Sequence, residues 1–350
     1  MSDVEIIEVR EAHRFDENAL LEYMSAHVAG FSGELDVRQF EGGQSNPTFL
    51  LEADGTHYVM RKQPPGQLLP SAHQVDREHR VMHALRDTPV PVPEMYCLCE
   101  DPEIIGTKFY VMEWIDGRLL TEGLLPTFSP EDRRATYNDL IRVLAELHKV
   151  DPAAVGLETF GRPGNYYERQ IGRWSKQYVA SKTEQIDAMD ALMEWLPANV
   201  PQDVSSVVVH GDYRLGNVLL HPTEPRVAAV LDWELSTLGD GLADLGYICQ
   251  DYHSESYTDV GLAGADLASL NIPTEEELVA EYCKHSGRPA IENWTFYIAY
   301  NMFRSAAIVQ GVYKRGLDGN ASSAKALLYG EIARRRGERG WQLLQERGLV

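Results

Sequence analysis

Short apolar runs alternate with histidine, aspartate and asparagine in the stretch VVVHGDYRLGNVLLHPTEPRVAAVLDWELSTLGD, which extends from Val207 to Asp240. Valine-rich runs of this kind, bounded by turn residues, are typical of short β-strands. Polar side chains therefore stand where these strands are expected to end. Carboxylate and amide groups in such places cost free energy unless a partner satisfies them. The pattern favours a fold whose short strands carry polar side chains to a binding site.

Three oxygen-bearing side chains are expected at the strand ends, namely Asp212, Asn217 and Asp232. Mg²⁺ prefers oxygen ligands and is usually held by one or two carboxylates together with substrate phosphates. Asp212 precedes Asn217 by five residues, which is the offset of the D-x-x-x-x-N catalytic loop of protein kinases. In that loop the aspartate accepts the hydroxyl proton and the asparagine holds a metal. The stretch therefore indicates a site for a metal and a phosphate.

Composition limits the class of protein. The chain has 350 residues, of which 44% are hydrophobic, which suits one large domain or two lobes. Its net charge of −21 argues against nucleic acid or an anionic membrane as the main partner. No apolar run approaches the roughly 20 residues of a membrane span, and the N-terminus lacks a secretory signal pattern. Four cysteines without zinc-site spacing are expected to be free thiols. We expect a cytoplasmic globular protein.

The first part of the chain has the pattern of a small sheet. Residues 36–62 carry two turn signals, Gly42-Gly43 and Asp54-Gly55, between runs of β-forming residues. This spacing predicts three antiparallel strands in succession. A small antiparallel sheet is therefore expected to open the fold.

The pattern changes from strands to helices near the end of the first third of the chain. Two further strands are predicted within residues 89–101 and 107–117. Beyond them, apolar residues recur at helical spacing, which predicts a mainly helical second part. Its main helical segments are 137–148, 165–198 and 274–348, with the most apolar run at 294–313.

One glutamate stands on an otherwise apolar helical face. The segment SAHQVDREHRVMHALRD is predicted to be a helix in which Val75, Glu78 and Met82 share one face. A glutamate among apolar neighbours is nearly always paired with a cation. The preceding predicted strand offers Arg61 and Lys62, and strand alternation sends these two side chains to opposite faces of the sheet.

The residues HGDYRLGN, followed by VLDWE, resemble the catalytic motifs of the aminoglycoside phosphotransferase family, the small-molecule branch of the protein-kinase-like fold. Further similar segments occur in the family's order, namely GGQSNPTF, YVMRK, REHRVMHAL and FYVMEWIDG, and the resemblance covers residues 35–250. Together with RKQPPGQLLPSAHQVDRE, these segments are most similar to the kinase-like domains fused to acyl-CoA dehydrogenases. The resemblance implies an α+β, two-lobed fold. A small antiparallel-sheet lobe over 1–115 would bind nucleotide, and a larger, mainly helical lobe over 116–350 would carry catalysis and the acceptor.

The resemblance also implies a role for each polar residue of the opening stretch. Asp212 would be the catalytic base or would orient the acceptor hydroxyl. Asn217 and Asp232 would hold Mg²⁺ between the β- and γ-phosphates of the nucleotide. His210 is expected to brace the catalytic loop, the alternative being proton transfer. Arg214 either stabilises charge on the γ-phosphate or is an ordinary exposed arginine.

Other positions are implied to bind the nucleotide. Arg61 would contact the α- and β-phosphates and pair with Glu78, with Lys62 as the alternative for this position. A turn before the second strand would cover the phosphates with backbone N–H groups and short polar side chains. The residues of this turn are Gly42, Gly43, Ser45 and Asn46. Backbone groups from Glu113 to Ile115 would contact adenine.

The phosphate acceptor is implied less directly. The association with acyl-CoA dehydrogenases implies a hydroxyacyl-CoA or hydroxy acid as acceptor, whose phosphorylated hydroxyl becomes a leaving group, and such a dehydrogenase as partner. An aminoglycoside, another aminosugar or a choline-type compound is the alternative acceptor. Arg304 either faces an anionic substrate group or pairs with a nearby acid. ATP and GTP both stay open as co-substrate, and the oligomeric state is undetermined.

Two observations narrow the class of activity. A helical pattern begins soon after Asp232 and leaves little room for the long activation segment of protein kinases, so a protein acceptor is disfavoured. The chain has no GxxxxGK[ST] motif, which argues against a P-loop enzyme. A different class of function, a catalytically silent nucleotide-binding partner of a dehydrogenase, is disfavoured because Asp212, Asn217 and Asp232 are all retained.

Overall fold

The structure is a computed structural model that describes residues 5–41, 46–66, 73–162, 164–202, 205–255, 261–319 and 324–350. The chain divides into two compact units, each built from separate segments of the sequence. Unit 1 comprises Met1–Thr121, Glu131–Glu158 and His210–Ser236, and unit 2 comprises Glu122–Pro130, Thr159–Val209 and Thr237–Val350. Unit 1 thus continues beyond residue 115, and the lobe boundary expected there stays a prediction.

Unit 1 contains a six-stranded antiparallel sheet with the strand order β1-β2-β3-β4-β6-β5. The strands are β1 (Ile6–Ile7), β2 (Asp36–Phe40), β3 (Thr48–Ala53), β4 (Thr56–Lys62), β5 (Met95–Cys99) and β6 (Phe109–Glu113). The tight turn between β3 and β4 is formed by Asp54 and Gly55, both with positive φ, as a two-residue hairpin of type I′ requires. The three strands predicted over 36–62 and the two that follow are therefore confirmed.

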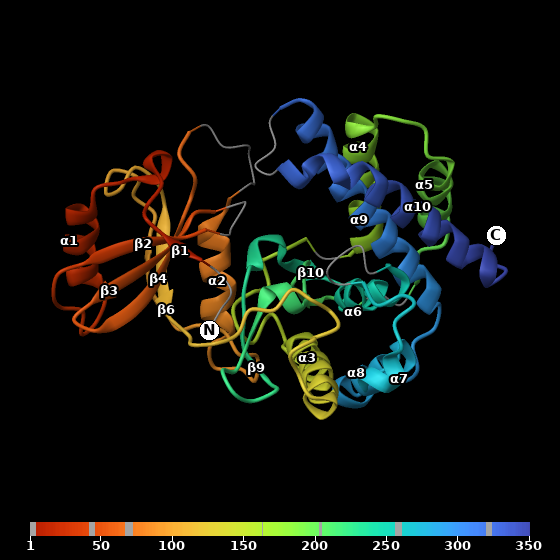
Figure 1. Ribbon diagram of the computed structural model, residues 1–350, viewed down its shortest axis with the longest axis horizontal. Coiled ribbons are helices and arrows are strands. Elements are labelled where there is room, and N and C mark those ends of the chain that lie inside the picture. Colours follow the sequence, from red (N-terminus) through yellow and green to blue (C-terminus); the bar gives the residue numbers. More distant parts are fainter. Residues whose placement is uncertain are drawn as a thin grey trace. The chain divides into compact units, whose positions relative to one another are not determined.

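Two helices flank this sheet, which lies between them in Figure 1. They are α1 (Glu17–His27) and α2 (Val75–Leu85). Asp16 caps α1, because its Oδ1 accepts hydrogen bonds from the backbone N–H groups of Asn18 and Ala19, at 3.0 and 3.1 Å. The helix predicted around Glu78 is confirmed as α2, and Glu78 is buried in it.

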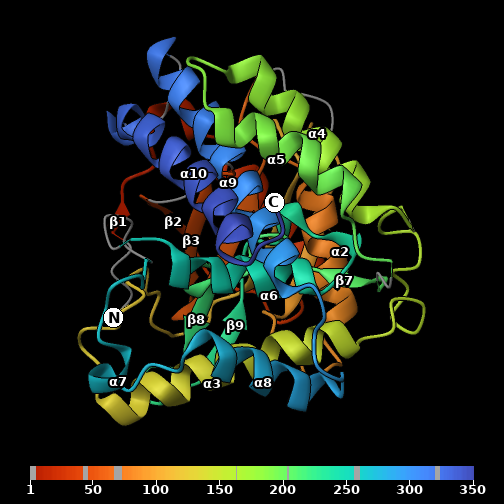
Figure 2. The ribbon, with the colours of Figure 1, turned by 90° about the vertical axis from the view of Figure 1, so that its right-hand side faces the viewer.

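The segment predicted to be the catalytic loop also lies in unit 1. The 3₁₀ turn η2 (Leu215–Asn217) leads into β8 (Val218–Leu220), which pairs with β9 (Val227–Val230); Figure 2 shows these two strands side by side. A second 3₁₀ turn, η3 (Trp233–Leu235), follows β9. The long helix α3 (Pro130–Lys149) shares the unit and accepts a hydrogen bond at the Leu140 carbonyl from the Tyr213 hydroxyl, at 2.9 Å.

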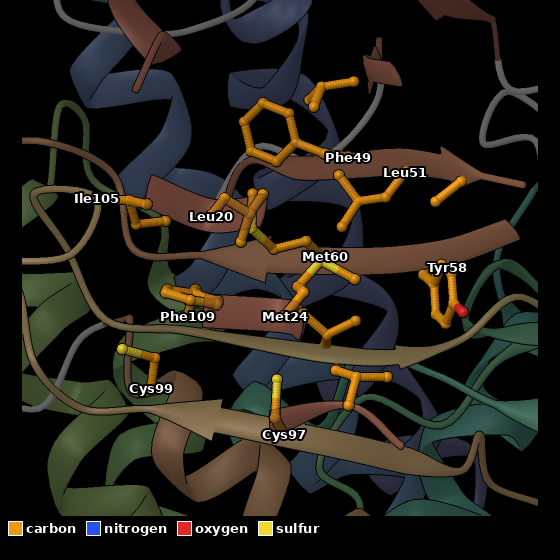
Figure 3. Packing of buried hydrophobic residues seen from close by; sticks show 14 residues of the cluster. Leu20, Met24, Phe49, Leu51, Tyr58, Met60, Cys97, Cys99, Ile105 and Phe109 are labelled. Atoms are coloured by element: carbon orange, nitrogen blue, oxygen red, sulfur yellow. The ribbon is translucent and has the colours of Figure 1, made fainter. Parts of the chain in front are cut away.

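The hydrophobic core of unit 1 lies on the α1 side of the sheet (Figure 3). Leu20 and Met24 of α1 meet Phe49, Met60 and Phe109 of three strands, and all five side chains are buried. Because alternate residues of a strand face opposite sides of the sheet, the residues next to Phe49, Met60 and Phe109 in sequence point to the other face. All four cysteines are free thiols, as expected.

Unit 2 is mainly helical. The short strands β7 (Val207–Val209) and β10 (Thr237–Gly239) pair antiparallel within it. Its helices are α4 (Tyr166–Ser181), α5 (Asp187–Ala198), α6 (Leu242–Cys249), α7 (Leu267–Leu270), α8 (Glu275–Ser286), α9 (Trp294–Leu317) and α10 (Tyr329–Glu346). Within the described residues, the other 3₁₀ segments are η1 (Glu11–His13), η4 (Gln250–His253) and η5 (Ala324–Leu328).

Helix α9 is the centre of unit 2. It contacts α4, α5, α6 and α10, and it lies alongside α10 in both ribbon views. Phe296, Tyr300 and Phe303 are among its buried side chains, as the apolar pattern over 294–313 predicted. An antiparallel sheet and a helical unit together confirm the α+β class. Among the described residues, none of the helices has a stretch long and apolar enough to cross a lipid bilayer.

Candidate active site

A glycine in a left-handed conformation shapes the start of the predicted catalytic loop. Gly211 has φ +85°, and a Cβ built on it would lie 2.6 Å from the carbonyl oxygen of Leu235. A side chain here would be strained and would also clash with the backbone of η3. The HGD sequence therefore forms a tight turn that sets the position of Asp212.

His210 is fully buried and braces this turn. Its Nδ1 accepts a hydrogen bond from the backbone N–H of Asp212 at 3.2 Å, and Nε2 lies 2.9 Å from the carbonyl of Leu231. Nδ1 is the acceptor, so Nε2 carries the proton and donates it. The ring also lies 4.6 Å from that of Trp233, between centroids. Both ring nitrogens serve the backbone, which favours the bracing role over proton transfer.

Asp212 and Asn217 are joined directly. Nδ2 of Asn217 donates to Oδ2 of Asp212 at 2.7 Å and to its backbone carbonyl at 2.8 Å. The turn η2 brings the two residues together, and in it the backbone N–H of Asn217 donates to the carbonyl of Arg214 at 2.9 Å. In the part of the chain that the structure describes, no donor reaches Oδ1 of Asp212 or Oδ1 of Asn217. Each residue therefore keeps one oxygen for a ligand.

Asp232 adopts an uncommon backbone conformation, with φ 62° and ψ 60°. Aspartate tolerates this left-handed region better than most residues, and such outliers gather at functional sites. The backbone also links Asp232 to Asn217, because the N–H of the preceding Leu231 bonds to the carbonyl of Asn217 at 2.8 Å. One carboxylate and one amide oxygen form a hard donor set that suits Mg²⁺ once phosphate oxygens complete it.

Arg61 bridges two acidic residues. Its Nη1 lies 3.3 Å from Oε2 of Glu78, and its Nη2 lies 2.8 Å from Oδ1 of Asp232. A third carboxylate, that of Glu234, is 3.9 Å from Nη2. Lys62 points to the opposite face of the sheet, where its Nζ lies 5.7 Å from the ring centre of Phe15. Of the two candidate cations, Arg61 is thus the partner of Glu78.

Glu78 is completely buried and has two further donors. Nδ2 of Asn46 donates to its Oε1 at 2.8 Å, and the hydroxyl of Tyr110 donates to its Oε2 at 3.1 Å. Burial raises the pKa of Glu78 to about 7, and the adjacent Arg61 guanidinium opposes this rise. The carboxylate is therefore held by three partners from three different segments.

Two members of this network were not predicted from the sequence. Tyr110 lies directly opposite Arg61 in the β4–β6 pairing, so both side chains face α2. His73 contributes indirectly, because its Nδ1 lies 3.0 Å from Oδ1 of Asn46. The spacing of FYVME indicated a strand, but the identity of the residue opposite Arg61 depends on register, which the sequence pattern left open.

Arg214 lies beside the carboxylate of Asp212, the predicted base. Its Nε is 3.5 Å from Oδ2 of Asp212, the same oxygen that accepts from Asn217. About a third of the side chain is exposed, so the guanidinium can reach a ligand. Its assignment to the γ-phosphate stays a prediction.

The expected nucleotide-covering turn is described only in part. Gly42, Gly43 and Ser45 lie outside the described residues. Asn46 is fully buried, and its side-chain amide donates to Glu78. Contact of Asn46 with a phosphate stays a prediction.

The predicted adenine-binding segment follows β6. The N–H of Glu113 bonds to the carbonyl of Glu94 at 2.8 Å, which ties this end of β6 to the segment before β5. Between Glu113 and Ile115, the ring of Trp114 stacks on Phe40 of β2, with centroids 5.9 Å apart and 7° between planes. Contact of Glu113 and Ile115 with a base stays a prediction.

In unit 2, Arg304 is buried on α9. Its guanidinium carbon lies 5.1 Å from the ring centre of Tyr247 and 5.7 Å from that of Trp174. Two aromatic faces thus stabilise the charge of this arginine. A contact of Arg304 with substrate stays a prediction.

Several known proteins are similar to this chain. The model of the phosphotransferase enzyme family matches residues 36–288. Acyl-CoA dehydrogenase family member 10 of Mus musculus is 44% identical over 344 residues, which cover 97% of this chain but only 32% of that protein. The chain therefore spans about a third of the length of this relative.

Solved structures extend the comparison. A candidate aminoglycoside phosphotransferase from Ralstonia eutropha JMP134 is 50% identical, with a TM-score of 0.86 over 95% of this chain and 99% of its own. Aminoglycoside phosphotransferase APH(4)-Ia, solved as a ternary complex with ADP and hygromycin B, is 16% identical, with a TM-score of 0.62 over 94% of this chain and 98% of its own. The second similarity shows a shared kinase-like fold.

Proposed function

The chain belongs to the phosphotransferase enzyme family, and we propose that it transfers the γ-phosphoryl group of ATP or GTP to a hydroxyl group of a small molecule, with Mg²⁺. The observation that carries this proposal is the hydrogen bond from Nδ2 of Asn217 to Oδ2 of Asp212, at 2.7 Å. A backbone bond from Leu231 to Asn217 ties the neighbouring Asp232 to the same loop. A base beside an acceptor hydroxyl and a metal across the phosphates are most of what phosphoryl transfer requires.

In the proposed reaction, Oδ1 of Asp212 accepts the proton of the acceptor hydroxyl. The acceptor oxygen forms a bond to the γ-phosphorus, while the bond from that phosphorus to the bridging oxygen of the β-phosphate breaks. The electron pair stays on the departing nucleoside diphosphate. Asn217 holds Asp212 in position through Oδ2, so that Oδ1 faces the acceptor.

The charge of the phosphates needs cations. Asn217 and Asp232 are the residues that would hold Mg²⁺, which neutralises phosphate charge when bound. Arg61 supplies a fixed positive charge that Glu78 holds in place, and the hydroxyl of Tyr110 in turn donates to Glu78. Arg214 would add a donor near the transferred group.

The proposed acceptor is a hydroxyacyl-CoA or a hydroxy acid. Support comes from the relatives named acyl-CoA dehydrogenase family members, in which a segment similar to this chain is part of a longer protein. Phosphorylation converts a hydroxyl into a good leaving group, which would prepare such an acyl chain for elimination. An acyl-CoA dehydrogenase is accordingly the proposed protein partner. The name of the Ralstonia protein supports an aminoglycoside as the second candidate acceptor.

The test is phosphorylation of a panel of compounds. Hydroxyacyl-CoAs, aminoglycosides, choline and sugar alcohols are incubated with the protein, Mg²⁺ and ATP or GTP, and added phosphoryl groups are detected by mass spectrometry. Phosphorylation of hydroxyacyl compounds alone supports the first proposal, and phosphorylation of aminoglycosides supports the second. If a nucleotide raises the melting temperature of the protein but no phosphoryl group is transferred, not even to water, the result favours a catalytically silent nucleotide-binding partner of a dehydrogenase.

A further inference from the structure

A second glycine of the catalytic loop, Gly216, lies in η2 directly before Asn217. A Cβ built on Gly216 would lie 2.5 Å from Nη1 of Arg214 and 3.3 Å from its Cζ. The arginine side chain therefore folds back over η2 and fills the space that a side chain at 216 would occupy. Cγ2 of Thr121 lies 3.5 Å from the same Cβ position.

Backbone freedom does not explain this glycine. Gly216 is not among the residues with positive φ, whereas Gly211 of the same loop is. Alanine could therefore adopt the backbone conformation of Gly216 without strain. The atom in conflict is the end of a flexible side chain, so an added methyl group would displace Arg214 and leave the backbone in place.

Because Gly216 has no side chain, the guanidinium of Arg214 can lie next to the carboxylate of Asp212. Nε of Arg214 lies 3.5 Å from Oδ2 of Asp212, and Nδ2 of Asn217 lies 2.7 Å from the same oxygen. Both contacts are made to Oδ2, so Oδ1 of Asp212 stays available to a ligand. A displaced guanidinium would carry its charge away from this carboxylate and from any group that approaches it.

We propose that Gly216 is a positioning residue: the lack of a side chain at 216 seats the guanidinium of Arg214 beside Asp212. This inference rests on the proposed function insofar as it assigns Arg214 to phosphoryl transfer. Gly216 acts only through Arg214.

A double-mutant cycle tests the proposal. The proteins compared are the wild type, Gly216→Ala, Arg214→Met and the double variant, with kcat, KM and the melting temperature measured for each. We expect Gly216→Ala to keep the melting temperature but to lower kcat by about tenfold, as Arg214→Met does. In the Arg214→Met background, Gly216→Ala should cause no further loss, because the group that it displaces is absent. If kcat of the double variant instead falls by the product of the two single-variant factors, the proposal is overturned.

Gly172→Ala provides the matched control. Gly172 lies in α4, has no positive φ, and a Cβ built on it meets nothing within 4 Å. This variant should keep the wild-type kcat.

A measurement that does not depend on activity separates this inference from the proposed function. The Nε–H resonance of Arg214, identified by its loss in Arg214→Met, should shift in Gly216→Ala and stay in place in Gly172→Ala. If the wild type transfers no phosphoryl group, even to water, but this shift is seen, the proposed function fails and the positioning role stands. If the resonance is unchanged in Gly216→Ala, the positioning role is wrong, whatever the activity.

Discussion

Nη2 of Arg61 lies 2.8 Å from Oδ1 of Asp232, while Nη1 of the same guanidinium lies 3.3 Å from Oε2 of Glu78. One cation thus connects helix α2 to a predicted metal ligand. Lysine cannot replace it, because a single ammonium lacks the planar fork that reaches two carboxylates. In Arg61→Lys we expect the dissociation constant for Mg·nucleotide to rise by about tenfold, since one hydrogen bond to a charged group contributes about 1.5–3 kcal/mol.

Calorimetric titration with Mg²⁺ and a non-hydrolysable nucleotide measures this change. Arg38→Lys is the control, because Arg38 lies on β2 with a side chain that is 47% exposed. An Arg61→Lys variant that binds nucleotide as tightly as the Arg38→Lys control would contradict the role given to the bridge.

The buried amide of Asn46 is expected to stabilise the fold through Glu78. Removing its donor leaves Oε1 of Glu78 without the hydrogen bond that now measures 2.8 Å. Asn46→Ala should lower the free energy of unfolding by about 1–3 kcal/mol, the usual cost of an unsatisfied buried polar group. Urea denaturation measures this loss. Asn199→Ala, at an exposed position, should cost much less; equal losses would mean that the contact with Glu78 contributes nothing.

His79 on α2 should make stability depend on pH. Burial lowers the pKa of His79 to about 4, and the neighbouring His83 adds to this effect. The unfolded chain then binds a proton at His79 near pH 6.5, whereas the folded chain binds it only near pH 4. The contribution of His79 to stability is therefore complete above pH 6.5 and is lost as the pH falls toward 4.

We expect the free energy of unfolding to fall less steeply over this range in His79→Gln than in the wild type. Denaturation at pH 8, where both side chains are neutral, gives the difference that is due to packing alone. Identical slopes between pH 6.5 and 5 would show that His79 is not the group responsible.

Gly211 should be intolerant of any side chain. Gly211→Ala combines a positive φ with a contact of 2.6 Å between the new Cβ and the carbonyl of Leu235. Gly106 has the same φ, +85°, but open space around its Cβ position. Gly106→Ala therefore measures the cost of φ alone, about 1–3 kcal/mol. Gly211→Ala should lose clearly more stability in thermal unfolding, and a loss equal to that of Gly106→Ala would contradict the clash.

The strands and helices around the site could be predicted because their signals are local. The Asp54-Gly55 turn set the β3–β4 hairpin, and the apolar face of α2 placed Glu78 inside. A buried glutamate then required a cation, and Arg61 provides it. Short-range turn chemistry and helical periodicity were sufficient for these features.

Contacts between distant segments could not be predicted in this way. Tyr110 faces Glu78 only because β4 and β6 pair in one register, and a shift by one residue would turn it away. His73 and Asn46 are separated by 27 residues and meet through their side chains. The close approach of the Arg214 side chain to Gly216 depends on a side-chain conformation, which the periodicity of the sequence does not reveal.

The most direct test of the central claim is a comparison of turnover and nucleotide affinity in Asp212→Asn. The change keeps the size of the side chain but removes the base, so with an acceptor from the panel we expect kcat to fall by about 10²–10⁴-fold. The dissociation constant for Mg·nucleotide should stay close to the wild-type value, because Asn217 and Asp232 are the proposed metal ligands. An Asp212→Asn variant that transfers phosphate at the wild-type rate would contradict the account, and a parallel loss of nucleotide binding would make Asp212 a metal ligand instead.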